Sequence, residues 1–308
     1  MKRLAAGPKL PEDPADTGGN GRGSKMAYKN LLLHIDNTKA CAKRIEAALA
    51  LATRCGAHLS ALYCMGEFQL PGWADMPQHL TREYLSREEE RAREVVEDFE
   101  EKAKRAGVSY ETRTARVPVN AIADEVGMHA RYADLAILGQ VDPDDTPEGT
   151  RDLVEDVTLG CGRPVLVVPY IGAAKENGNV VLGRKVMVAW DAGREATRAV
   201  NDALPMLQKA EKVDLLAVNP VKSQRRHGEN PGADIALHLA RHGVKVEVQH
   251  LEVHDIEAGD TILSRLADEG SDLLVMGAYG HSRLRELVLG GATRSVLEHM
   301  TVPVIMSH

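Results

Sequence analysis

The sequence predicts an α/β protein of two tandem domains, each built around a mostly parallel sheet with helices on both faces. Short apolar runs of strand character alternate with segments of helical period, and this alternation occurs twice. Strands that alternate with helices form parallel sheets, because each helix carries the chain back across the sheet. A chain of 308 residues is also long enough for two such domains.

The two halves repeat one order of segments. Each half opens on a short apolar run that ends in an aspartate, Asp36 or Asp191, and continues as a helix-period segment. Further on, ADLAILG at 133–139 matches SDLLVMG at 271–277, 138 residues later. Each half then closes on a short apolar run that starts at a proline. A repeat of this kind indicates one structural unit used twice.

Changes in composition predict where the domains begin and end. Residues 1–25 are rich in Gly, Pro and Asp and lack an apolar run, so we expect a disordered extension and not a secretory signal. The two domains are then 26–170 and 185–308. The Gly- and Asn-rich stretch 171–184 is the expected linker.

Local patterns of apolar residues predict the individual strands and helices. Leu31–Ile35 and Val186–Trp190 are continuous apolar runs, which is typical of strands buried on both faces. Arg82–Ala106, the longest predicted helix, has one apolar stripe and is otherwise charged, so we expect it to cover one face of a sheet. A helical pattern also runs to Leu207, and Pro205 within it predicts a kink. Along each unit these patterns give four strands separated by three helices.

A glycine motif in the second half indicates an anion site. Gly277 directly follows an apolar strand, Gly280 comes three residues later, and Gly290 and Gly291 precede a segment that suits a helix. Ligands of open parallel sheets lie beyond the carboxyl ends of the strands. The start of a helix there has unpaired N–H groups and the positive end of the helix dipole, which together bind phosphate.

Several other nucleotide or catalytic motifs do not fit the sequence. The Walker pattern G-x-x-x-x-G-K-[ST] does not occur, and the first strand of each half ends in IDN or WDAG rather than G-x-G-x-x-G. Gly280-His-Ser-Arg-Leu284 resembles a nucleophile elbow, but Leu284 stands where that motif needs glycine. A serine hydrolase is therefore not expected.

From about Lys29 to His308 the chain resembles the universal stress proteins in their tandem two-domain bacterial form. The family signature G-x2-G-x9-G-[ST] corresponds here to Gly277, Gly280, Gly290 and Gly291, with glycine in place of the final serine or threonine. Gly291 keeps the backbone N–H and loses the hydroxyl, which Thr293 or Ser295 can supply nearby. The resemblance implies a Rossmann-like (adenine nucleotide alpha hydrolase-like) fold with five strands per domain.

The resemblance also implies an ATP site in the second half, with or without Mg²⁺. The base and ribose would contact Asp191, with Ala189 and Trp190 before it, and Val218 from the second strand. The phosphates would lie among the glycine motif and the residues around it. The positions implied are Ala189, Trp190, Asp191, Val218, Met276, Gly277, Gly280, Gly290, Gly291, Ala292 and Thr293. The chemistry agrees, since an aspartate accepts hydrogen bonds from ribose and apolar side chains pack on a base. Asp191 can equally act as a helix N-cap, and one residue can do both.

The first half departs from the signature. Gly139 matches Gly277, but Asp142 falls at the position of Gly280, and Arg151 and Asp152 fall at the second glycine pair. The intervening QVDPDDTPEGTRD carries five carboxylates, which repel a triphosphate. We therefore expect the first half not to bind ATP in the family's way.

Several other polar residues each allow two interpretations. His281 can neutralise phosphate charge or cap the loop, and Arg283 can bind phosphate or pair with a surface glutamate. His238 and His242 are four residues apart on a predicted helix, which is a spacing that permits a shared metal. No glutamate follows the first histidine, so a metalloprotease is not expected. Surface histidines are a simpler interpretation than a zinc site.

Composition limits the partners and the compartment. The net charge of −7 argues against broad nucleic-acid binding, and no apolar run approaches the length of a membrane helix. Cys41, Cys55, Cys64 and Cys161 lack C-x-x-C spacing, so reduced thiols and a cytoplasmic protein are expected.

Assembly follows from the last strand of each unit. Val165–Val168 and Val302–Met306 are short and apolar, and as free edges they would invite aggregation. The family pairs such strands between domains, so we expect internal pairing as a pseudo-dimer and further association of two chains as a homodimer.

Three functions remain open from the sequence. The first is an ATP-binding stress-response regulator or protector with little or slow hydrolysis, to which Asp191 or His281 would contribute. The second is a nucleotide-free dimerisation or interaction scaffold. The third is an enzyme with an adenylating or phosphatase-like activity, which a turnover well above one per minute would favour.

Overall fold

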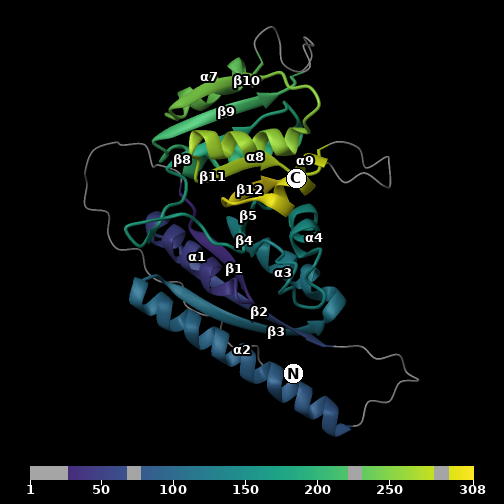
Figure 1. Ribbon diagram of the computed structural model, residues 1–308. Coiled ribbons are helices and arrows are strands. Elements are labelled where there is room, and N and C mark those ends of the chain that lie inside the picture. Colours follow the sequence, from purple (N-terminus) through teal and green to yellow (C-terminus); the bar gives the residue numbers. More distant parts are fainter. Residues whose placement is uncertain (1–26, 68–77, 221–230, 281–290) are drawn as a thin grey trace, which may run out of the picture.

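Ten strands form one continuous sheet across both halves of the chain (Figure 1). The computed structural model describes residues 27–67, 78–220, 231–280 and 291–308, and the expected N-terminal extension lies outside them. The strand order is β10-β9-β8-β11-β12-β5-β4-β1-β2-β3. Each half therefore contributes a five-stranded unit, as the family resemblance implied.

The N-terminal unit follows a β-α order throughout. Its elements are β1 (Asn30–Ile35), α1 (Cys41–Cys55), β2 (His58–Glu67), α2 (Gln78–Ala106), β3 (Tyr110–Pro118), α3 (Ile122–Ala130), β4 (Leu135–Gly139), α4 (Leu153–Gly160) and β5 (Val165–Val168), with a short 3-10 turn at Val119–Ala121. All neighbouring strands within this unit are parallel.

The C-terminal unit repeats this order. Its elements are β8 (Lys185–Ala189), α5 (Arg194–Asp202), α6 (Leu204–Leu207), β9 (Lys212–Val218), α7 (Ala233–Arg241), β10 (Val246–Leu251), α8 (Ala258–Glu269), β11 (Leu273–Gly277), α9 (Gly291–His299) and β12 (Val304–Ser307). The predicted kink is confirmed, because the helix ends at Asp202 and a separate turn of helix starts with Pro205 in its first turn.

Two apolar cores lie on opposite faces of the sheet, and each contains residues of both units. One core joins the apolar faces of α1, α2, α5, α6 and α7, and includes Phe99 from the long helix α2. The other joins α3, α4, α8 and α9. Alternate residues of β1 separate the faces, with Leu31 and Leu33 in the first core and Leu32 in the second.

The last strands of the two units pair with each other, which confirms the expected internal pseudo-dimer. Val304 lies opposite Val167 and Met306 opposite Val165 in an antiparallel ladder. All four side chains are fully buried. The edges that would have been free therefore lie at the centre of the sheet (Figure 1).

The residue patterns predicted four strands in each unit and missed the fifth. β3 and β10 lie at the two outer edges of the sheet, and in both most residues are half-buried or exposed. An edge strand pairs on one side only, so it does not need the apolar run by which the inner strands were recognised.

The expected linker is partly ordered structure. Within 171–184, β6 (Lys175–Glu176) and β7 (Asn179–Val180) form a small hairpin. Arg54 of the N-terminal unit donates hydrogen bonds to the carbonyls of Leu182 and Gly183, so the linker is fixed to the helix that it passes.

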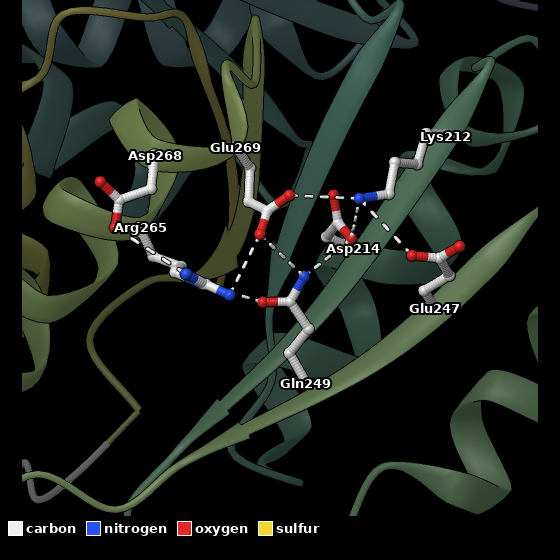
Figure 2. Close-up of polar contacts among 7 residues, drawn as sticks. All are labelled: Lys212, Asp214, Glu247, Gln249, Arg265, Asp268 and Glu269. Carbon is white, nitrogen blue, oxygen red and sulfur yellow. Dashed lines mark hydrogen bonds and ion pairs between the residues drawn. The ribbon is translucent and has the colours of Figure 1, made fainter.

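A polar network ties the outer strands of the C-terminal unit to α8 (Figure 2). Nζ of Lys212 lies 2.9 Å from Oδ1 of Asp214, 3.2 Å from Oε2 of Glu269 and 3.5 Å from Oε2 of Glu247. Arg265 continues the network to Gln249, Asp268 and Glu269. Asp214 is 1% exposed, so its charge is buried beneath these partners. The network lies at the amino end of β9, away from the glycine motif.

Among the residues described, no helix has both the length and the apolar character needed to cross a bilayer.

Candidate functional site

The fold brings most of the predicted site residues to one edge of the C-terminal sheet. β9, β8 and β11 are parallel neighbours, so their carboxyl ends lie side by side. Asp191 follows β8, Val218 ends β9 and Gly277 ends β11. The described residues gathered at this edge are Ala189, Trp190, Asp191, Val218, Met276, Gly277, Gly280, Gly291, Ala292 and Thr293. His281, Arg283 and Gly290 lie outside the described residues, as does Leu284 of the elbow-like segment.

Backbone strain is concentrated at this edge. Ala192, Asn219 and Tyr279 all have left-handed backbone angles, with φ of 58°, 47° and 57°. Each follows the end of one of the three strands by one to three residues. This conformation costs Ala192 and Tyr279 about 1–2 kcal/mol each and Asn219 less, and strained residues of this kind cluster at active and ligand-binding sites. Strain at three neighbouring turns marks this edge as a candidate binding site.

Asp191 shapes the turn between β8 and α5. Its Oδ1 accepts a hydrogen bond of 2.8 Å from the backbone N–H of Gly193, which is the residue at the N-cap position. The interpretation of Asp191 as the N-cap is therefore wrong by two residues. The Asp191 carboxylate does, however, hold the turn that leads into the helix. Asp36 does the same in the N-terminal unit, where Oδ1 accepts from N–H of Thr38 at 3.0 Å.

Gly277 is required by the packing of α5. A Cβ at this position would collide with the backbone nitrogen of Ala196 and lie 2.7 Å from the carbonyl carbon of Glu195. The absent side chain therefore makes room for the helix. Close approach of a ligand, the reason expected from the sequence, is not what this geometry requires.

Gly280 lies between two carboxylates. A Cβ there would be 3.0 Å from Oε2 of Glu195 and 3.9 Å from Oδ2 of Asp191. Glu195 is 6% exposed and pairs with Nη2 of Arg194 at 2.9 Å. Burial raises the pKa of Glu195, but its backbone N–H and Arg194 outweigh this and lower it, so the group stays ionised. Glu195 was not among the predicted site residues; its place in the first turn of α5, four residues after Asp191, was the available signal.

The first turn of α9 is held against the glycine motif. The N–H of Tyr279 donates to Oγ1 of Thr293 at 3.3 Å. Thr293 is 4% exposed, and Ser295 donates its hydroxyl to Oδ1 of Asp260 at 2.6 Å. The Ser295 hydroxyl is therefore engaged as a donor within the protein, whereas the buried Thr293 oxygen serves as an acceptor for the backbone. The backbone N–H groups of the first turn, beginning at the exposed Gly291, are also available to an anion.

In the N-terminal unit the corresponding space is filled. Nη2 of Arg44, on α1, lies 2.6 Å from Oδ2 of Asp36. A Cβ at Gly139 would collide with Nη1 of the same arginine. The acidic segment, residues 140–152, folds over this ion pair. Within it, Asp145 accepts a hydrogen bond of 2.8 Å from the backbone N–H of Lys39. Only about 30 Å³ remains between these groups.

Two other polar groups near the candidate site or on the predicted helices pair within the protein. Arg294 pairs with Glu298 on the exposed side of α9, with Nε 2.8 Å from Oε1. The rings of His238 and His242 pack at a centroid distance of 4.7 Å. Within the residues described, no three His, Cys, Asp or Glu side chains are grouped as metal ligands would be.

Comparison with known proteins identifies the C-terminal unit. The sequence model of the "Universal stress protein family" matches residues 183–308. These residues belong to the universal stress protein family. The universal stress protein Slr1230 of Synechocystis is 45% identical over 67 residues, a stretch that covers 22% of this chain and 22% of that protein.

Solved structures show that the universal stress fold extends over both units. A universal stress protein from Archaeoglobus fulgidus aligns with 90% of this chain and 94% of its own, at 18% identity and a TM-score of 0.65. PA1789 of Pseudomonas aeruginosa, a protein of unknown function, aligns with 91% and 92% at 15% identity and a TM-score of 0.54. A shorter universal stress protein, solved in complex with cAMP, aligns with 47% of this chain at 18% identity and a TM-score of 0.33. The tandem arrangement is thus a known form of this fold.

Proposed function

We propose that the C-terminal domain binds ATP and that the protein acts as a stress-response regulator or protector with little or slow hydrolysis. The observation that carries the proposal is the position of Gly280. It lies beside Asp191 and is joined through Tyr279 to the first turn of α9, at the carboxyl edge of a parallel sheet. Such an edge is where open α/β sheets bind nucleotides, and the start of a helix there binds phosphate.

Each group at the edge has a role in this proposal. Val218 and Met276 supply apolar contacts for the base, and Asp191 accepts hydrogen bonds from the ribose hydroxyls. The phosphates lie along Gly280, Gly291 and Ala292, where backbone N–H groups can approach them. Gly277 contributes indirectly, by allowing α5 to pack against the end of β11. His281, Arg283 and Gly290 complete the motif in sequence.

The acidic side chains make Mg²⁺ part of the proposal. Glu195 lies next to Gly280, and Oε2 of Glu257 would be 3.5 Å from a Cβ at Gly291. Carboxylates this close repel a bare triphosphate. Mg²⁺ suits such a site, since it is commonly held by one or two carboxylates together with phosphate oxygens and water. Asp191 and Glu195 are the groups that would hold it.

A nucleotide-free scaffold is the second candidate function. The observation that favours it is the position of Arg44 in the N-terminal unit, where the guanidinium fills the space beside Asp36 and Gly139 that corresponds to the proposed nucleotide site. The universal stress fold is therefore compatible with a purely structural or interaction role in this chain.

We also propose that the protein is cytoplasmic and that two chains form a homodimer. The cysteines at positions 41, 55, 64 and 161 are all unpaired, which suits a reducing compartment. The homodimer stays an expectation from the family resemblance.

Gly280→Asp in the full-length chain tests ATP binding. The added carboxylate would lie against Glu195 and the phosphates, so we expect Mg²⁺-ATP affinity to fall at least about 100-fold, or about 2.7 kcal/mol. Isothermal titration calorimetry measures it. Gly160→Asp, which adds the same charge at an exposed helix end with open space around it, is the matched control and should leave affinity unchanged.

The calorimetry also decides between the candidate functions. A parent chain that takes up no adenine nucleotide would favour the scaffold. Equal affinities of the parent and Gly280→Asp would show that ATP binds elsewhere.

A further inference from the structure

A cavity of about 440 Å³ lies where the two units meet. One wall is formed by residues that come just before β1, β4 and β5 of the N-terminal unit. The other wall is formed by the second half of α5 and by Pro205 of the C-terminal unit. None of the lining residues belongs to the candidate nucleotide site. The volume is within the range of small-molecule sites, so the cavity has room for a ligand of its own.

Three cationic side chains line this cavity, and they come from three separate segments. Lys29 lies directly before β1, Arg163 lies two residues before β5, and Arg198 belongs to α5. All three residues are exposed. In the part of the chain that the structure describes, no carboxylate forms an ion pair with any of them. Their charges are therefore available to a ligand.

The two guanidinium groups are held in place by neutral acceptors. Nη2 of Arg198 donates to the carbonyl of Gly162 at 2.9 Å, and Nε of Arg163 donates to the carbonyl of Arg131 at 3.3 Å. A guanidinium has five N–H donors, and each of these bonds uses one of them. Both arginines thus keep further donors together with an uncompensated charge, a combination that binds oxyanions through paired hydrogen bonds.

The two carboxylates in the cavity wall hold strand ends. Oδ2 of Asp134 accepts the backbone N–H groups of Lys29 at 2.7 Å and of Asn30 at 3.0 Å, at the start of β1. Oδ2 of Asp202 accepts the hydroxyl of Ser307 at 2.8 Å, at the end of β12. The lining still carries more positive than negative charge, although the net charge of the whole chain is −7. A cavity of this sign attracts anions locally.

The backbone of the cavity wall is fixed across the boundary between the units. The hydroxyl of Tyr28 donates to the carbonyl of Asp202 at 2.8 Å, so the segment before β1 is held against the end of α5. Tyr28 is 4% exposed, and Pro164 and Pro205 restrict the two turns nearby. The backbone that carries the cations is thus ordered before a ligand arrives, which lowers the cost of binding.

We propose that this cavity binds a small multivalent oxyanion, with the size and charge of pyrophosphate, through Lys29, Arg163 and Arg198. Three cations on two walls match several negative oxygens better than they match a single negative charge. Lys29 and Arg163 belong to the N-terminal unit and Arg198 to the C-terminal unit, so the bound anion joins the two units. This proposal does not depend on ATP binding at the glycine motif.

Isothermal titration calorimetry with inorganic pyrophosphate tests this site on the full-length chain, at constant ionic strength and without Mg²⁺. Arg163→Met and Arg198→Met should each weaken the affinity about tenfold, because each removes charge-assisted hydrogen bonds. Arg105→Met, which removes an exposed cation on α2, is the matched control and should leave the affinity unchanged. Gly280→Asp should also leave it unchanged, since the glycine motif is not part of the cavity.

Hydrogen exchange of the parent chain locates the anion without any substitution. Pyrophosphate should slow amide exchange in residues 161–163 and in the second half of α5, and it should leave the first turn of α9 unchanged. Protection of α9 instead, together with loss of binding in Gly280→Asp, would place the anion at the glycine motif and contradict the proposal.

Two further results would also overturn the proposal. If pyrophosphate at millimolar concentration produces neither heat nor protection, the cavity does not take this class of anion. If Arg163→Met and Arg198→Met both bind pyrophosphate as tightly as the parent chain, the two arginines do not hold the anion.

Discussion

Arg44 and Asp36 form a buried ion pair at the carboxyl edge of the N-terminal unit. Nη2 of Arg44 lies 2.6 Å from Oδ2 of Asp36, and the arginine is 4% exposed. By topology Asp36 corresponds to Asp191, since each follows the first strand of its unit. The helix after Asp191 carries alanine where α1 carries Arg44, because Ala199 and Arg44 each lie eight residues beyond the aspartate. Arg44 therefore fills a position at the N-terminal edge where the C-terminal unit has only an alanine.

Removing Arg44 should destabilise the protein strongly. Burial raises the pKa of Asp36, but Arg44, with help from His34 and Thr38, brings it down to about 2, so the carboxylate stays charged. Arg44→Met leaves that charge buried without its cation, and we expect the free energy of unfolding to fall by about 3 kcal/mol in urea titration. Arg105→Met, which breaks an exposed pair with Glu101, should cost about 0.5 kcal/mol or less.

The double variant Arg44→Met/Asp36→Asn separates the lost pair from lost packing. It should recover part of the loss, because the uncompensated charge is gone. If the double variant is no more stable than Arg44→Met, the ion pair is not what holds this region together.

Acid should weaken the protein through His34. Burial lowers the pKa of His34 from 6.5 to about 4, so between these values the unfolded chain binds a proton that the folded chain does not. Stability therefore falls as pH drops from about 6.5 to 4, by up to about 3 kcal/mol. Chemical unfolding across this range measures the slope, and His34→Leu should flatten it. A slope that persists unchanged in this variant would assign the acid sensitivity to other groups.

The sequence was sufficient to predict the inner part of the fold. Strands such as Leu31–Ile35 must be buried on both faces, and that requirement leaves a continuous apolar run in the sequence. The repeat and the short closing strands predicted how the units join. β3 and β10 could not be recognised in this way, because the residues of an edge strand obey weaker constraints.

For the candidate site, the sequence predicted where residues lie better than what each of them contacts. Glycine spacing located the edge, but the spacing does not say what each glycine approaches. Gly277 proved to face the backbone of α5, and the Thr293 hydroxyl proved to hold Tyr279. Glu195 was missed because its proximity to Gly280 depends on how α5 packs against β11, which is a tertiary relationship.

The network at the amino end of β9 should behave as a cooperative unit (Figure 2). Lys212→Met removes the ammonium group 2.9 Å from Asp214, a carboxylate with a 2% exposed side chain. We expect a loss of about 3 kcal/mol in urea titration, since the remaining contact from Gln249 does not neutralise the charge. Lys212→Met/Asp214→Leu should restore most of it. Additive losses from the two substitutions would contradict coupling between them.

Gln140 should stabilise the contact between the two units. Its Nε2 donates to the carbonyl of Leu297 at 2.8 Å, near the end of α9, and its Oε1 accepts from N–H of Tyr170 at 3.2 Å. Gln140 is 6% exposed. Gln140→Leu therefore removes, at a buried position, the hydrogen-bond partner of the Leu297 carbonyl and of the Tyr170 N–H. We expect the free energy of unfolding to fall by about 2 kcal/mol, because unsatisfied buried polar groups cost about 1–3 kcal/mol.

Hydrogen exchange distinguishes this effect from general destabilisation. The Gln140 contact lies at the end of α9 opposite to Gly291, so its loss should raise amide exchange in α9 and in the segment after β5 more than in β1 and β2. Asn201→Ala, which removes an exposed side-chain bond to the carbonyl of Thr197, is the control and should change neither stability nor exchange in α9 appreciably. Uniform acceleration of exchange over the whole sheet in Gln140→Leu would show that the glutamine supports the fold as a whole and not the contact between the domains.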